Sequence, residues 1–104
     1  MSDVTLKAAA LAILAGGASW TQGALARKAD GLPCSPFHED AVKWDMMGAL
    51  IKAQLESDEP NYASYQLVYN SLRDALPADY KSRDIEAYND DADVVWGDIS
   101  DLFA

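Results

Sequence analysis

The segment 39–56, EDAVKWDMMGALIKAQLE, constrains the fold most, because at helical spacing it is apolar on two sides. At 100° per residue, one face carries Val42, Met46, Ala49, Leu50 and Ala53, and a nearly opposite face carries Trp44, Met47, Ile51 and Leu55. Such a helix has to be covered on both sides, so we expect it at the centre of the domain. Gly48 lowers its helix propensity by about 1 kcal/mol relative to alanine, and we expect a close helix crossing at that point.

The other segments also favour helices, so the predicted fold class is all-α. A first helix is expected to run to about Ala15 and to end at Gly16 and Gly17, followed by a short helix or helical turn from Trp20 to about Lys28. The helix after residues 39–56 is expected to be capped by Ser57 or Asp58 and stopped by Pro77. Its apolar stripe consists of Tyr62, Tyr65, Val68, Tyr69, Leu72 and Leu76. The last helix is expected to be capped at residues 89–91 and to end at Phe103, with its apolar side formed by Val95, Trp96, Ile99, Leu102 and Phe103. We therefore predict a compact bundle of about four to five helices around the helix 39–56, in one domain spanning residues 1–104.

The charge of the chain is concentrated at its C-terminal end. The formal net charge is −9, and residues 84–104 contain no lysine or arginine. The carboxylates of this stretch are Asp84, Glu86, Asp90, Asp91, Asp93, Asp98 and Asp101. Such a surface repels phosphate groups, which argues against direct binding to nucleic acid or to an anionic membrane. It would attract a basic protein surface, and we treat these seven residues as candidate partner-binding residues.

Cysteine usage and hydropathy point to the cytoplasm. Cys34 is the only cysteine, so no internal disulfide can form. No apolar run approaches the roughly 20 residues that span a bilayer. Residues 7–19 superficially resemble a secretory signal, but their alanine content and the acidic Asp3 favour an ordinary helix. We expect a cytoplasmic protein.

None of the common catalytic or metal-binding patterns is present in a convincing form. Cys34 and His38 stand four residues apart, but Pro36 lies between them in an expected loop and no third orienting group is evident. A zinc site from Cys34, His38 and Asp40 lacks paired ligand spacings, and the glycines do not form a phosphate-binding loop. The NDDAD stretch lacks the glycine and distal glutamate of a calcium-binding loop. We expect a protein that is not an enzyme and that has no metal and no cofactor.

Three strings of residues resemble an uncharacterised small helical domain family of actinobacteria, other bacteria and their phages. They are WTQGALAR from Trp20, DAVKW followed three residues later by GAL between Asp40 and Leu50, and IEAYND from Ile85. The resemblance implies a compact helical domain with no assigned activity. Two positions depart from the pattern: Asp45 stands where relatives often have cysteine, and Tyr88 stands where they often have tryptophan. This chain therefore cannot share any reactivity of that cysteine.

Two classes of function follow as hypotheses. The first is a small acidic binding protein that docks its carboxylates on a basic, nucleic-acid-binding surface, as phage-encoded inhibitors of host defence such as anti-CRISPR proteins do. The alternative is a small-ligand-binding domain or enzyme built around Trp20, Gln22, Arg27 and Asn89, because amide and guanidinium groups beside an aromatic ring suit a small polar ligand. Two plainer interpretations remain open: the acidic surface only keeps the protein soluble, and WTQGALAR only packs against the core. The oligomeric state is open as well.

Overall fold

The computed structural model describes residues 3–56, 62–80 and 85–103. The α-helices are α1 (Asp3–Ile13), α2 (Met46–Glu56), α3 (Tyr62–Asp74), α4 (Ile85–Asp90) and α5 (Trp96–Phe103). Two short 3-10 helices, η1 (Ala15–Gly17) and η2 (Ala78–Tyr80), follow α1 and α3. Three short strands, β1 (Ala26–Lys28), β2 (Pro33–Cys34) and β3 (Ala41–Trp44), lie between α1 and α2.

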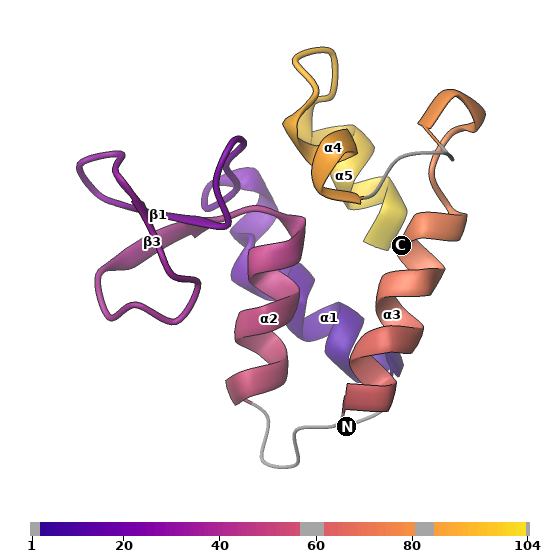
Figure 1. Ribbon diagram of the computed structural model, residues 1–104, viewed down its shortest axis with the longest axis horizontal. Coiled ribbons are helices and arrows are strands. Elements are labelled where there is room, and N and C mark those ends of the chain that lie inside the picture. The colour runs from indigo at the N-terminus through magenta and orange to yellow at the C-terminus, as the bar shows by residue number, and fades with distance from the viewer. Residues whose placement is uncertain (1–2, 57–61, 81–84, 104) are drawn as a thin grey trace.

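The three strands form a sheet, so the fold is α+β and the predicted all-α class is wrong. The strand order is β2-β1-β3 and both pairings are antiparallel, with Ala26 opposite Cys34 on one side and opposite Trp44 on the other. The sheet lies to one side of the helices (Figure 1). Its strand β1 covers the end of the segment 20–28, in which a short helix or helical turn was predicted, and residues 20–25 are not helical either.

A tight turn after β1 explains why this region is not helical. The N–H of Gly31 donates to the Lys28 carbonyl at 2.9 Å, and the N–H of Lys28 donates to the Leu32 carbonyl at 3.0 Å. Gly31 has φ = +86°, and the Asp30 carboxylate accepts from the Leu32 N–H at 3.0 Å. Asp-Gly is a strong hairpin signal because both residues tolerate turn conformations. The glycine therefore reverses a hairpin, whereas the sequence interpretation placed it just after a helix.

The predicted central helix 39–56 is also wrong in its first third. Residues 41–44 form β3, and α2 begins only at Met46, directly after Asp45. Its buried residues are Met46, Gly48, Ala49, Leu50 and Ala53, whereas the Val42 and Leu55 side chains are 43% and 51% exposed. The two-sided pattern thus mixed a strand with a helix that is buried mainly on one side.

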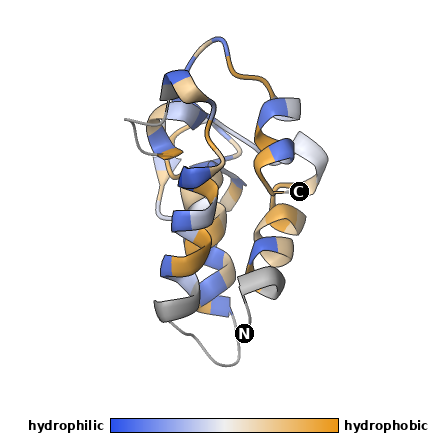
Figure 2. Cartoon of the chain, turned by 90° about the vertical axis from the view of Figure 1, so that its right-hand side faces the viewer, coloured by the Kyte–Doolittle hydropathy of each residue, from blue (hydrophilic) through white to orange (hydrophobic). Residues whose placement is uncertain are grey.

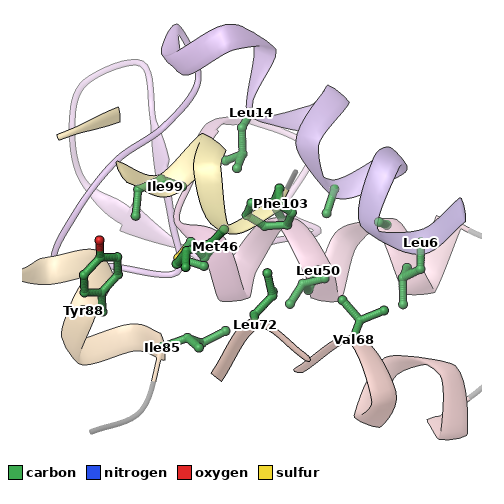
Figure 3. Packing of buried hydrophobic residues seen from close by; sticks show 14 of the residues in the cluster. Leu6, Leu14, Met46, Leu50, Val68, Leu72, Ile85, Tyr88, Ile99 and Phe103 are labelled. Atoms are coloured by element: carbon green, nitrogen blue, oxygen red, sulfur yellow. The ribbon is translucent and has the colours of Figure 1, made fainter. Parts of the chain in front are cut away.

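The first helix, rather than the segment 39–56, occupies the middle of the helical layer. α1 packs against α2, α3, α5 and η1, and its residues Leu6 and Ala10, together with Leu14 directly after it, are fully buried. α2 packs against α1, α4 and β3. Figure 3 shows side chains from all five helices meeting in one core, with Leu50 and Leu72 near its middle and Tyr88 at its edge. α1 is rich in alanine, which lets neighbouring helices approach it closely.

Several helix predictions agree with the structure. α1 ends at Ile13 and the chain turns through Gly16 and Gly17, both with positive φ. In α3, Val68 and Leu72 are buried and Tyr65 and Tyr69 pack against the core, as the predicted stripe requires. The predicted cap at Ser57 or Asp58 lies outside the described residues. Figure 2 shows hydrophilic and hydrophobic residues alternating along the helices, as expected where each helix has one face toward the core.

The C-terminal region contains two helices instead of the predicted one. α4 lies before the predicted last helix, in a stretch for which no helix was predicted, and Asn89 lies inside it rather than at the cap of the last helix. In α5, Ile99, Leu102 and Phe103 are buried as predicted, but Val95 is 61% exposed and does not point inward. Within the described ranges, none of the helices has the length and apolar character needed to cross a bilayer.

Candidate functional site

Asn89 of α4 is the centre of a buried hydrogen-bond network that joins α4 to the loop at residues 20–22 and to the start of α2. Its side-chain oxygen accepts from the Trp20 indole N–H at 2.8 Å and from the Met46 backbone N–H at 3.1 Å. Its side-chain nitrogen donates to the Thr21 carbonyl at 3.0 Å and to the Asp90 carboxylate at 3.1 Å. Asn89 is fully buried, and both donors and both acceptor positions of its amide are therefore used.

Gln22 binds the C-terminal end of the same helix. Its side-chain nitrogen donates to the carbonyls of Asn89 at 2.8 Å and Asp91 at 2.9 Å, and it lies 3.5 Å from the Val94 carbonyl. The last carbonyls of an α-helix lack partners within the helix, so a side-chain amide at this position stabilises its end. Gln22 thus acts as a cap supplied from a segment 67 to 72 residues earlier in the chain.

Neighbouring contacts hold the loop 20–23 in the same place. The Gly23 N–H donates to the Asp90 carboxylate at 2.8 Å, and the Trp20 ring lies 6.1 Å from the Trp96 ring. Arg27 folds back on its own segment, donating to the Thr21 hydroxyl at 3.2 Å and to the Gln22 and Gly31 carbonyls at 3.1 and 2.7 Å. We call Trp20, Gln22, Asn89 and Asp90 the amide network.

The candidate ligand-binding residues are therefore close together, but their polar groups are hydrogen-bonded to other groups of the domain. Trp20, Gln22 and Asn89 meet in the amide network, and Arg27 reaches it through the Gln22 carbonyl. A ligand would have to displace these hydrogen bonds. The structure supports core packing for WTQGALAR through Trp20, although Leu25 of this string is exposed.

The remaining candidate chemistry at Cys34 and His38 is not assembled into a site. Cys34 is half-buried in β2, whereas His38 is exposed and its Nδ1 accepts from the Asp40 N–H at 3.0 Å. Among the described residues, no group of three or more histidine, cysteine or acidic side chains is arranged to hold a metal ion.

Replacing Gln22 with methionine tests its role as a cap. The variant keeps the length of the side chain but removes the amide, so the carbonyls of Asn89 and Asp91 lose their donor. We expect the free energy of unfolding, measured by urea denaturation, to fall by about 1–2 kcal/mol. Gln66→Met is the matched control, because Gln66 is an exposed residue of α3 whose amide binds only the Asn70 side chain. It should change stability by less than about 0.5 kcal/mol. Equal effects of the two substitutions would contradict the capping role.

The described candidate partner-binding carboxylates lie on α4, in the α4–α5 connection and on α5. Asp84 lies outside the described residues. The charges of Asp90 and Glu86 on α4 contribute to the raised pKa of Asp45, whereas those of Asp98, Asp101 and Asp91 contribute to the raised pKa of Tyr88. Asp93 is exposed in the connection between α4 and α5. We call Glu86, Asp90, Asp91, Asp93, Asp98 and Asp101 the acidic face.

Part of the acidic face acts electrostatically on the Tyr88 hydroxyl. Burial raises the pKa of Tyr88, and the negative charges of Asp98, Asp101 and Asp91 raise it further. These carboxylates come from the α4–α5 connection and from two positions along α5. Some also shape the local backbone: Asp91 accepts from the Asp93 N–H at 2.8 Å, and Asp98 accepts from the Val95 N–H at 3.1 Å.

Sequence reasoning missed Asp45 as a functional candidate and noted it only as the residue that stands where relatives often have cysteine. Asp45 precedes α2, and its carboxylate oxygen accepts from the Gly48 N–H at 2.5 Å, so it is the N-cap of this helix. Burial raises the pKa of Asp45 to about 7, opposed by the N–H groups of Gly48 and Met47 and reinforced by the charges of Asp90 and Glu86. An aspartate immediately before an apolar helical run is a recognised start signal and could have indicated this cap.

These features define a small α+β domain in which α4 is fixed by hydrogen bonds from Trp20, Gln22 and Gly23 of the N-terminal half. The chain belongs to a family of unknown function, DUF6197, whose model matches residues 2–104. This confirms the membership of an uncharacterised family that the three sequence strings indicated. No curated protein and no solved structure is significantly similar to the chain.

Proposed function

We propose that this domain is a non-enzymatic binding protein that docks its acidic face on a basic surface of a partner protein. The observation that carries the proposal is the run of carboxylates over α4, the α4–α5 connection and α5, of which Asp98, Asp101 and Asp91 act electrostatically on Tyr88. Residues 84–104 contain no lysine or arginine that could neutralise them from within the same segment. Electrostatic complementarity of this kind contributes mainly to the rate and specificity of association.

The acidic face also has the rigidity and the apolar contact that a docking surface needs. Asn89 of α4 donates to the Thr21 carbonyl and Gln22 donates to the Asn89 carbonyl, so the carboxylates of α4 are presented from a fixed backbone. Val95 is 61% exposed and lies between Asp93 and Asp98 in the sequence. An exposed apolar side chain surrounded by charges is the usual composition of a protein interface, with an apolar centre and a polar rim.

The finer form of the proposal concerns the type of partner. Carboxylates spaced along a helix can occupy a groove that is built for phosphates, so a nucleic-acid-binding protein is the partner class that fits best. An inhibitor of a host defence system would work in this way. The small-ligand alternative lacks comparable support, because the polar groups it needs are bonded within the amide network.

The docking role is tested with the double variant Asp93→Asn, Asp101→Asn. Both side chains are exposed, so their removal should leave the fold intact. The matched control is Glu39→Gln, Asp40→Asn, which removes two exposed charges from the loop between β2 and β3. We expect capture of a basic partner from host lysate at low salt to weaken roughly two- to tenfold for the acidic-face variant only, and high salt to release the partner from the unmodified protein.

Equal loss of capture in both double variants would show a general effect of net charge and would contradict a defined docking surface. Capture that survives in the acidic-face variant at low salt would also contradict the proposal. Circular dichroism of both variants establishes that the helices are retained, so that a loss of binding is not a loss of fold.

A further inference from the structure

The Asp45 carboxyl occupies an unusual position for an acidic group in this domain. Its residue is only 2% exposed, and its backbone is fixed by a hydrogen bond from its own N–H to the Leu25 carbonyl at 3.1 Å. The next residue, Met46, donates its N–H to Asn89 of α4 at 3.1 Å. Asp45 therefore lies where β3 ends, α2 begins and α4 is attached.

The charged groups facing Asp45 from α4 are both negative. Glu86 and Asp90 act on its carboxyl, and Asp90 also accepts from the Gly23 N–H and the Asn89 amide. Three of the five bases on the neighbouring elements are engaged elsewhere, whereas Lys28 of β1 is half-buried, Lys43 of β3 is exposed, and neither forms an ion pair with Asp45. Arg27 of β1 donates to Thr21, Gln22 and Gly31, Lys7 of α1 donates to Ser71, and Lys52 of α2 pairs with Glu56.

Ionisation of Asp45 thus places a third negative charge beside two existing ones in a water-poor environment. The N–H groups at the start of α2 favour the charged form, but such end-of-helix interactions are weaker than the loss of hydration of a buried carboxylate. The neutral carboxyl still accepts the hydrogen bond from Gly48. The N-cap therefore survives protonation, whereas the repulsion toward α4 appears only on ionisation.

We propose that Asp45 is a pH-sensitive switch that couples binding of one proton to the docking of α4 against the start of α2. When Asp45 is neutral, Glu86 and Asp90 lie beside an uncharged group and α4 is held by the amide network. When Asp45 is ionised, repulsion between the three carboxylates weakens the attachment of α4, and with it the hydrogen bonds from Trp20, Gln22 and Gly23. This inference does not depend on the proposed docking function.

The sign of the pH dependence follows from the direction of the pKa shift. The pKa of Asp45 is raised from 3.8 to about 7 in the folded protein, so the folded state binds the proton more tightly than the unfolded chain. The stabilisation is fully present below about pH 4, declines as the pH rises, and is lost above about pH 7. A difference of about three pH units corresponds to roughly a thousandfold change in the folding equilibrium constant.

The experiment compares the unmodified protein, Asp45→Asn and the charge-matched control Asp93→Asn between about pH 5 and pH 8.5. Hydrogen exchange of the α4 amides and urea denaturation are measured for each. We expect the unmodified protein and Asp93→Asn to lose α4 protection as the pH rises, and Asp45→Asn to keep it, because asparagine caps the helix without acquiring charge. The same pH dependence of α4 protection in Asp45→Asn and in the unmodified protein would overturn the proposal.

A second measurement covers the case in which Asp45→Asn does not fold. The carboxyl carbon of Asp45 is followed by NMR during a pH titration of the unmodified protein and of Glu86→Gln. A midpoint near pH 7 that moves to lower pH in Glu86→Gln supports the coupling to α4. A midpoint below about pH 5, or one that does not move when Glu86 is neutralised, would overturn it.

Discussion

Replacing Gly48 with alanine is expected to prevent stable folding of this domain. A Cβ atom at this position would lie 1.9 Å from the carbonyl oxygen of Leu25 and 2.9 Å from its carbonyl carbon. Both atoms belong to the backbone that leads into β1, and the Asp45 N–H bonds to the same carbonyl. Relief of the clash would have to separate α2 from the sheet, so we expect a loss of about 4 kcal/mol or more.

The measurement is urea denaturation followed by circular dichroism, with Gly97→Ala as the matched control. Gly97 lies in the first turn of α5, and a Cβ there would meet nothing within 4 Å. Alanine is the better helix former, so the control should keep its stability or gain up to about 1 kcal/mol. A Gly48→Ala protein as stable as the control would show that the approach of α2 to Leu25 is not required.

Replacing Asn89 with alanine is the second substitution with a large expected effect. It leaves the Trp20 indole N–H, the Met46 N–H and the Thr21 carbonyl without the partner they have in the folded protein. Buried polar groups that lose their hydrogen bonds each lower stability by about 1–3 kcal/mol. Partial access of water reduces the sum, so we expect the free energy of unfolding to fall by about 3–5 kcal/mol.

Asn70→Ala on α3 is the control for this substitution. Asn70 is exposed, and its side-chain oxygen accepts only from Gln66 at 3.3 Å. Its replacement should change stability by less than about 0.5 kcal/mol. The indole N–H signal of Trp20 in NMR spectra gives a local readout, because it should move in Asn89→Ala and stay in place in Asn70→Ala. A small stability change in Asn89→Ala would mean that the amide network contributes little to the fold.

The helical parts of the fold could be predicted because they follow local rules. Gly16 and Gly17 end the first helix, and the spacing of Val68, Leu72 and Leu76 matches one buried face. The sheet could not be recognised from alternation, because its strands have only two to four residues. Val42 and Trp44 also fit the spacing of the helix that follows. Asp30-Gly31 and Asp45 were the local signals for the hairpin and for the true helix start.

The candidate site was predictable in its membership but not in its role. Trp20, Gln22 and Asn89 were selected together as a ligand-binding set, and the structure does bring them together. Their use as internal partners depends on contacts between residues nearly 70 positions apart, which no local pattern contains. The raised pKa of Asp45 likewise depends on burial and on Asp90 and Glu86 from another helix. The assignment of the acidic face to a partner stays a prediction.

The distance along the chain between Gln22 and its acceptors has a consequence for synthesis of the protein on the ribosome. The carbonyls of Asn89, Asp91 and Val94 are made 67 to 72 residues after Gln22. The Gln22 amide and the Trp20 indole therefore stay hydrated until α4 and the residues after it have emerged from the ribosome. Long-range closure of this kind makes folding a late and cooperative event, and it exposes truncated translation products to proteases.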